Sequence, residues 1–292
     1  MITAFEIYKL KIESPVDIIV HRLNKLIYGK QKANEIKFFK TSNSLRKKYF
    51  KNGLWNFNGI ILPEKPDDPP GLITLIYRDT LLVYCAHQDN YDSKLVDKLD
   101  PYLPEGTYCY KNDQIDVTVK PGDIVIDAGA WIGDFSAYAS KKGAFTYAFE
   151  PCKNTVKYLN MTSEFNKNIT VVEYGLGDKK ETLYLTHCDE NSGANKVISD
   201  THDAEEIHIT TIDCFVAENN IERIDFIKAD IEGFERKMLL GAKETLKKFA
   251  PKLAICTYHL PDDPEVLANI ILEANPNYII VQKKMKLYAM VK

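Results

Sequence analysis

The 292-residue chain lacks the sequence features of secreted, membrane-spanning and strongly basic proteins. Its six cysteines are scattered without a Cys-x-x-Cys pair, so neither a disulfide framework nor a zinc ribbon is expected. No apolar run reaches the ~18 residues of a membrane span, and the first residues show no leader pattern. The net charge of −3 argues against an overall polycation that would bind nucleic acid. We therefore expect a cytoplasmic protein with reduced thiols and no nucleic-acid partner.

The charge balance and the pattern of apolar residues differ between the N-terminal part of the chain and the part that follows residue 106. Residues 1–52 carry 12 basic and 4 acidic side chains, although the whole chain is slightly acidic. Helical spacing over 14–29 and strand-like runs over 54–62 and 72–77 predict an N-terminal α+β extension over residues 1–106, which contains no catalytic motif. We expect this extension to recognise a substrate or to dimerise, which leaves a homo-oligomer open. Its basic side chains form either a solvated face or a phosphate contact.

From residue 107 onward, short buried strands alternate with amphipathic helices. We expect strands over 124–127, 145–149, 170–174, 182–186, 208–211, 225–229, 253–258, 278–282 and 286–290, and helices over 133–142, 153–165, 234–248 and 264–273. This alternation is typical of an α/β fold with a parallel sheet covered on both faces. Only residues 283–285 separate the last two strands, which forbids a parallel crossover and predicts an antiparallel edge strand at the end of the chain.

A glycine-containing turn follows the first strand of this region. Asp127, Gly129 and Gly133 lie in it, and Glu150 ends the next strand. Ligands of open parallel sheets bind beyond the carboxyl ends of the strands, where glycines allow close approach to the backbone. The complete dinucleotide fingerprint and the P-loop lysine are absent. Two glycines with a preceding acid, and a carboxylate that accepts hydrogen bonds from ribose hydroxyls, indicate S-adenosylmethionine.

Several strings of the sequence carry a family resemblance. They are Asp127–Gly133 (DAGAWIG), Phe149–Pro151 (FEP), Gly177–Asp178, Ile227–Glu235 (IKADIEGFE) and Leu240–Ala242 (LGA). Over roughly residues 107–292 the chain resembles the FkbM family of S-adenosylmethionine-dependent methyltransferases. The resemblance implies a class I methyltransferase (Rossmann-like) sheet of seven strands, order 3-2-1-4-5-7-6, in a methyltransferase domain over 107–292. It also implies O-methylation, because the family mostly methylates hydroxyl groups of sugars, polyketides and similar molecules.

The same resemblance places the cofactor. The residues expected to bind it are Asp127, Gly129, Ala130, Trp131, Gly133, Glu150, Pro151, Gly177, Asp178 and Asp230. Asp127 and the two turn glycines would line the methionine part, Glu150 the ribose, and Asp178 the adenine amino group. Two of these assignments have structural alternatives, since Trp131 could instead fill the core and Asp178 could cap a turn.

Catalytic groups are expected where strands end. Methyl transfer to a hydroxyl group requires a general base that removes the hydroxyl proton, and His259 and Asp230 are the candidates. Glu232 and His187 are expected to contact the acceptor, a small molecule or glycan. Asp230, Glu232 and His259 could together hold a divalent cation, but their spacing is not a recognised metal signature, so no metal is expected.

The predicted function is O-methyl transfer to a sugar, nucleotide-sugar or glycan precursor. One alternative is a nitrogen, lipid or protein acceptor, against which the absence of an Asn/Asp-Pro-Pro-Tyr motif after the 225–229 strand argues. A non-catalytic module that binds S-adenosylmethionine is the other alternative.

Overall fold

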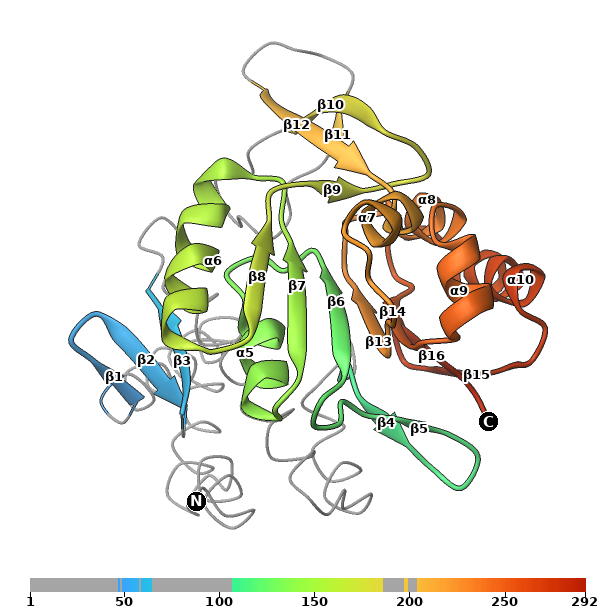
Figure 1. The fold of residues 1–292 in the computed structure, drawn as a ribbon, viewed down its shortest axis with the longest axis horizontal. Coiled ribbons are helices and arrows are strands. Elements are labelled where there is room, and N and C mark those ends of the chain that lie inside the picture. The colour runs from blue at the N-terminus through green and yellow to red at the C-terminus, as the bar shows by residue number, and fades with distance from the viewer. Residues whose placement is uncertain (1–46, 48, 58, 65–106, 186–196, 199–203) are drawn as a thin grey trace, which may run out of the picture.

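A computed structural model describes residues 47, 49–57, 59–64, 107–185, 197–198 and 204–292 (Figure 1). The helix expected over 14–29, the strand expected over 72–77 and His187 lie outside the described residues. Within the part of the chain that is described, no helix is long and apolar enough to span a membrane.

A seven-stranded sheet forms the centre of the molecule (Figure 1). In chain order its strands are β6 (Ile124–Ala128), β7 (Phe145–Phe149), β8 (Ile169–Val172), β13 (Phe226–Ala229), β14 (Lys252–Cys256), β15 (Tyr278–Lys283) and β16 (Lys286–Val291). Their spatial order is β15-β16-β14-β13-β6-β7-β8, which confirms the expected class I order 3-2-1-4-5-7-6. β15 is the edge strand and pairs antiparallel with β16, whereas the chain's last strand, β16, lies one position inside, next to β14.

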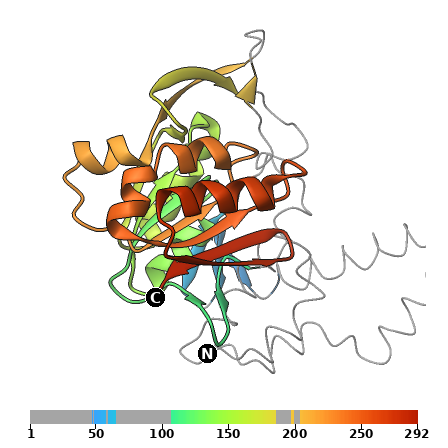
Figure 2. The ribbon, with the colours of Figure 1, turned by 90° about the vertical axis from the view of Figure 1, so that its right-hand side faces the viewer.

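Helices cover the two faces of this sheet. The helices of the domain are α5 (Asp134–Lys141), α6 (Lys153–Phe165), α7 (Ile212–Glu218), α8 (Glu235–Leu240), α9 (Lys243–Phe249) and α10 (Asp263–Ala274). Val125 and Phe226 face a core that α5 contributes to, and their neighbours Ile126 and Ile227 face a core built with α8, α9 and α10. Alternate residues of one strand therefore serve opposite cores, which explains why the strands read as apolar throughout. Figure 2 shows α8 to α10 gathered on one side of the sheet.

The helix expected over 234–248 is wrong as a single element, because the structure breaks it into α8 and α9. The side chain of Asp213 in α7 supplies the reason. Its carboxylate accepts hydrogen bonds from the backbone nitrogens of Glu244 (3.0 Å) and Thr245 (2.8 Å) in the first turn of α9. A new helix start thus receives its cap from a segment far away in the sequence.

A second, four-stranded sheet lies beyond the carboxyl ends of β7 and β8 (Figure 1). Its strands are β9 (Gly175–Leu176), β10 (Glu181–Leu185), β11 (Val197–Ile198) and β12 (Glu205–Thr210), in the order β11-β10-β12-β9. The sequence indicated β10 and the end of β12 but missed β9 and β11. This small sheet provides one wall of the site described below.

The described part of the N-terminal region packs onto the main domain. β1 (Phe50–Lys51), β2 (Leu54–Phe57) and β3 (Ile60–Pro63) form a small antiparallel sheet, where one strand over 54–62 was expected. Trp55 and Ile60 are buried in the same core as the α5 side chains. Asn166 at the end of α6 donates to the carbonyl oxygen of Ile61 at 2.7 Å. A further hairpin, β4 (Tyr110–Lys111) with β5 (Asp116–Val117), precedes β6.

Candidate cofactor and acceptor site

A pocket lies at the carboxyl ends of β6, β7 and β13, where open parallel sheets bind their ligands. Six of the residues singled out from the sequence line it, namely Gly129, Trp131, Glu150, Pro151, Asp230 and Glu232. The sequence therefore located the pocket, although it did not assign every role within it.

Glu150 is the buried carboxylate of the pocket. Its side chain accepts hydrogen bonds from the backbone nitrogens of Trp131 and Cys152, both at 3.0 Å. Burial raises the pKa of Glu150 to about 7, despite these two donors and the charge of Lys228. Each carboxylate oxygen still has a lone pair available, so Glu150 can accept two hydroxyl donors from a ligand.

The glycine turn allows close packing between neighbouring elements of the chain. A Cβ atom on Gly129, whose φ is +70°, would lie 1.9 Å from the carbonyl oxygen of Asp230, so only glycine fits between β6 and β13. Gly133 lies against α6, where a Cβ atom would come within 2.8 Å of Leu159. Gly133 therefore lets the helices pack closely and does not line the pocket.

Asp127 is expected at the methionine part of the cofactor, but the structure commits it to an internal ion pair. It is fully buried, and its Oδ1 lies 2.9 Å from Lys228 Nζ while its Oδ2 accepts from Ser136 at 2.6 Å. Lys228 also donates to the carbonyl oxygen of Gly129 at 2.7 Å. The pair holds the glycine turn in place and lies outside the pocket lining.

Three further residues expected to bind the cofactor are not among the pocket's lining residues. Ala130 is fully buried, and its nitrogen donates to the carbonyl oxygen of Phe149 at 2.8 Å. Gly177 packs against Ile209, where a Cβ atom would lie at 2.8 Å. Asp178 is exposed beyond β9 and does not reach the pocket.

An apolar wall formed by the small sheet is the part of the pocket that the sequence missed. Leu176, Leu185, Ile207 and Ile209 line it, and each is at least 95% buried. Alternation of apolar residues in β12 was the available signal, but the pairing of β12 with β9 and β10 could not be seen from the sequence.

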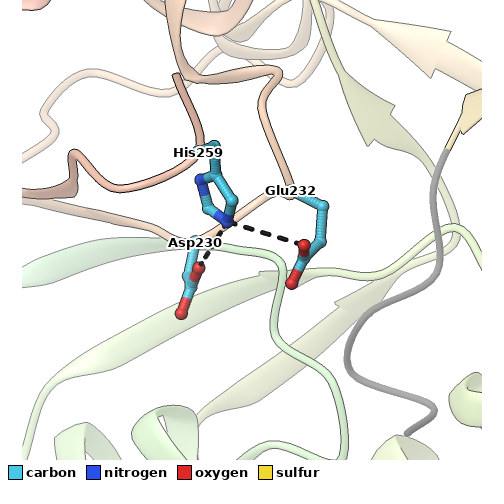
Figure 3. A group of neighbouring side chains, drawn as sticks. All are labelled: Asp230, Glu232 and His259. Carbon is cyan, nitrogen blue, oxygen red and sulfur yellow. Dashed lines mark ion pairs between the residues drawn. The ribbon is translucent and has the colours of Figure 1, made fainter. Parts of the chain in front are cut away.

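Asp230, Glu232 and His259 converge next to this pocket, as Figure 3 shows. Asp230 follows β13, Glu232 lies in the turn before α8, and His259 follows β14. His259 Nε2 lies 3.7 Å from Asp230 Oδ1 and 3.5 Å from Glu232 Oε2. The structure thus brings together the two residues expected in catalysis and one expected to contact the acceptor.

Asp230 is held as an anion by its surroundings. Tyr108 donates to Oδ2 at 2.5 Å, and Tyr258 donates to Oδ1 at 2.9 Å. Burial alone would raise the pKa of Asp230, but the charges of Lys286 and Lys228, with the two hydroxyl donors, hold it below its ordinary value. A carboxylate so stabilised is a weak base.

Glu235 holds both the imidazole and the turn that precedes α8. Its Oε1 lies 3.1 Å from His259 Nδ1. Its carboxylate also accepts from the backbone nitrogens of Ile231 (2.8 Å) and Gly233 (3.1 Å). Burial would lower the pKa of His259, but Glu235 first, and then Asp230 and Glu232, raise it above its ordinary value. The contacts of Glu235 thus go beyond the favourable interaction with the helix dipole that any acid at a helix start has.

More than half of the chain matches a known protein family. The model of the methyltransferase FkbM domain matches residues 127–280. Methyltransferase FkbM from Methylobacillus flagellatus KT shares 21% identity with a TM-score of 0.49, and the match covers 90% of this chain and 60% of that one. Fibrillarin from Aeropyrum pernix, solved with S-adenosyl-L-methionine, shares 12% identity with a TM-score of 0.39, covering 66% and 74% of the two chains.

A curated relative comes from Pseudomonas aeruginosa. The AMB antimetabolite synthetase AmbE is 25% identical over 187 residues, which cover 48% of this chain and 9% of the synthetase. The chain thus spans only a small part of that relative's length.

Proposed function

Because the chain belongs to the FkbM methyltransferase family, we propose that it transfers the methyl group of S-adenosylmethionine to a hydroxyl group of a sugar, nucleotide-sugar or glycan precursor. One observation carries this proposal. A buried carboxylate suited to a ribose, Glu150, lines the same pocket as Asp230 and Glu232, the two acids that contact His259 and suit an acceptor hydroxyl.

The chemistry of the pocket supports one orientation of the cofactor. The apolar wall of Leu176, Leu185, Ile207 and Ile209 suits the flat faces of adenine. Glu150 accepts the ribose hydroxyls, and the sulfonium end then lies toward Gly129 and the acidic cluster. The negative charge of the cluster attracts the positively charged sulfonium before the reaction. After methyl transfer the sulfur is neutral, so this attraction no longer holds the product.

The reaction is an in-line displacement at the sulfonium methyl. The acceptor oxygen forms the new C–O bond, the C–S bond breaks, and S-adenosylhomocysteine leaves as a neutral thioether, so the enzyme must align the partners and dispose of the hydroxyl proton. We propose that His259 and Asp230 serve removal of this proton and that Glu232 contacts the acceptor. Asp230 orients the cluster, since each of its carboxylate oxygens accepts a hydrogen bond from one tyrosine hydroxyl.

The surroundings of the cluster suit a ring-shaped polar acceptor. The ring of Tyr258 lies beside His259 with centroids 4.1 Å apart, and the residue is 38% exposed. An aromatic face with a polar tip can pack on the apolar face of a sugar. We further propose that residues 1–106 contribute to acceptor recognition or to a dimer, and that His187 contacts the acceptor.

Two measurements test the proposal. Isothermal titration should show S-adenosylhomocysteine binding, and incubation with S-adenosylmethionine and a panel of sugars and sugar nucleotides should add 14 Da to one acceptor. His259→Asn should lose turnover but keep cofactor binding, whereas His208→Asn, on the exposed face of β12, should keep both. Absence of cofactor binding would refute the proposal, and a methylated amine, lipid or protein in place of a sugar would refute its acceptor class.

A further inference from the structure

Asp230, Glu232 and His259 offer three ligand atoms in one place. One carboxylate oxygen from each acid and one ring nitrogen all lie within 4.8 Å of one another. Figure 3 shows the imidazole directed between the two carboxylates. We infer that these three side chains form a binding site for a divalent cation of the Mn²⁺ type.

The imidazole of His259 provides an observation independent of the acids. Its side chain is only 9% exposed, and although Nδ1 contacts Glu235, the buried Nε2 forms no hydrogen bond with the described residues. Nε2 faces the two carboxylates at 3.5 and 3.7 Å, beyond the range of a good hydrogen bond to either. A buried nitrogen directed at two anions, without a proton-sharing contact, is what a metal ligand needs.

The distances also suit a shared ion. Ligands about 2.0–2.2 Å from one cation lie roughly 3.0–3.6 Å apart at octahedral or tetrahedral angles. The two separations measured from Nε2 are 3.5 and 3.7 Å, close to this range, and all three ligand atoms lie within 4.8 Å of one another, so small side-chain movements would bring them around one ion. Three protein ligands leave coordination positions open, as catalytic metal sites do.

Glu235 completes the arrangement from behind. Its carboxylate lies 3.1 Å from Nδ1, the ring nitrogen opposite the proposed ligand atom. Carboxylates in this place fix the orientation of metal-binding imidazoles and make them more basic. Because the same carboxylate also holds the backbone of Ile231 and Gly233, it sets the position of Glu232 in that turn as well.

The donor set selects the class of cation. Two carboxylates with one imidazole are harder than a zinc site rich in histidine or cysteine, and the nitrogen disfavours Mg²⁺ and Ca²⁺, which prefer oxygen alone. Mn²⁺ accepts both donor types. The sequence did not predict a metal because the three residues have no signature spacing, and only the neighbouring positions of β13 and β14 bring them together.

This inference deepens the proposed function and rests on it for its catalytic meaning. An acceptor hydroxyl bound at an open position of the cation would lose its proton more readily, because a divalent charge stabilises the alkoxide. The proton passes to solvent, and the oxygen then attacks the sulfonium methyl. His259 would in that case serve deprotonation as a ligand, through the cation.

Mn²⁺ itself is the probe for the binding test. Titration of the full chain with Mn²⁺, followed by electron paramagnetic resonance without cofactor or acceptor, should show one tight site per chain. Glu232→Gln and His259→Gln should each weaken it at least tenfold. The exposed matched controls Glu273→Gln and His208→Gln should leave it unchanged. Glu235→Gln should weaken it about tenfold as well, since it removes the charge behind the imidazole.

The same samples are titrated with S-adenosylhomocysteine to verify folding and to separate the two proposals. Loss of Mn²⁺ affinity together with retained S-adenosylhomocysteine affinity in the Glu232 and His259 variants supports the cation site. Wild-type protein that binds S-adenosylhomocysteine but binds Mn²⁺ no better than these variants overturns the site and leaves the methyltransferase proposal standing. Tight Mn²⁺ binding without S-adenosylhomocysteine binding supports the site and refutes the methyltransferase proposal.

Discussion

The buried carboxylate of Glu150 is expected to make affinity for the proposed cofactor depend on pH near neutrality. Burial raises its pKa to about 7, so the carboxyl group is protonated at mildly acidic pH. Only the ionised group can accept hydrogen bonds from both ribose hydroxyls and the two backbone donors of Trp131 and Cys152. We therefore expect affinity for S-adenosylhomocysteine to rise with pH.

The magnitude follows from the ionised fraction. With a pKa of about 7, Glu150 is about 9% ionised at pH 6 and about 91% ionised at pH 8. When only one form binds, the apparent Kd is the intrinsic Kd divided by the competent fraction. The Kd should thus fall about tenfold between pH 6 and pH 8, which is close to 1.4 kcal/mol.

The free energy of unfolding of the unligated protein should instead fall as pH rises. The folded protein holds the proton more tightly than the unfolded chain, since the pKa rises from 4.5 to about 7 on folding. This contribution to stability is complete below pH 4.5 and is lost as pH rises through 7. The thermal shift that S-adenosylhomocysteine causes should therefore grow over the range in which the unligated protein loses stability.

Isothermal titration at intervals from pH 6 to pH 8 measures the effect, with 5′-methylthioadenosine as a second ligand that has the ribose but no titrating amino acid part. Glu150→Gln should bind both ligands weakly and without this pH dependence. Glu173→Gln, exposed at the end of β8, should behave as the wild type. Equal affinity at pH 6 and pH 8, or an unchanged pH dependence in Glu150→Gln, would refute the reasoning.

Three further predictions concern the frame of the site. Gly129→Ala should lower the free energy of unfolding by more than about 3 kcal/mol, because its Cβ would lie 1.9 Å from a carbonyl oxygen. Gly53 has a φ of +78° but nothing within 4 Å of a Cβ atom, so Gly53→Ala should lower it by only about 1–2 kcal/mol. Urea denaturation measures both. Lys228→Met leaves Asp127 as an unpaired buried charge and should cost about 3–5 kcal/mol, part of which Asp127→Asn should restore in the double variant. Ile207→Ala should raise the Kd for S-adenosylhomocysteine about fivefold or more by removing apolar contact area, measured by isothermal titration.

The sheet could be predicted from the sequence because the patterns that indicate each strand and connection lie within short segments of the chain. Short apolar runs separated by helical periods imply a parallel sheet, and the three-residue connection before the last strand implies an antiparallel neighbour. The break between α8 and α9 could not be predicted in the same way. Its cap, Asp213, comes from another helix, so the sequence from 234 to 248 alone reads as one continuous helix.

The role of Asp127 shows what a motif can and cannot reveal. The sequence marked the turn that contains Gly129 and assigned its acid, Asp127, to the ligand. In the sheet, Asp127 of β6 is the register partner of Lys228 of β13, and the two form a buried ion pair. A lysine within an apolar strand has no local sequence signal for burial, so the pairing appears only when the two strands are placed side by side.

Some of the side chains that surround Asp230 lie outside the matched FkbM region. Tyr108 donates to Asp230, and Lys286 lies with its ammonium 4.1 Å from the centre of the Tyr108 ring, yet both residues fall outside 127–280. Lys286 is also the leading charge that keeps Asp230 ionised. The described pocket is thus lined by residues of the matched region, whereas the charge state of Asp230 depends on residues outside that region. Differences in acceptor among chains that share the FkbM match are therefore expected to follow these flanking residues more closely than the glycine turn.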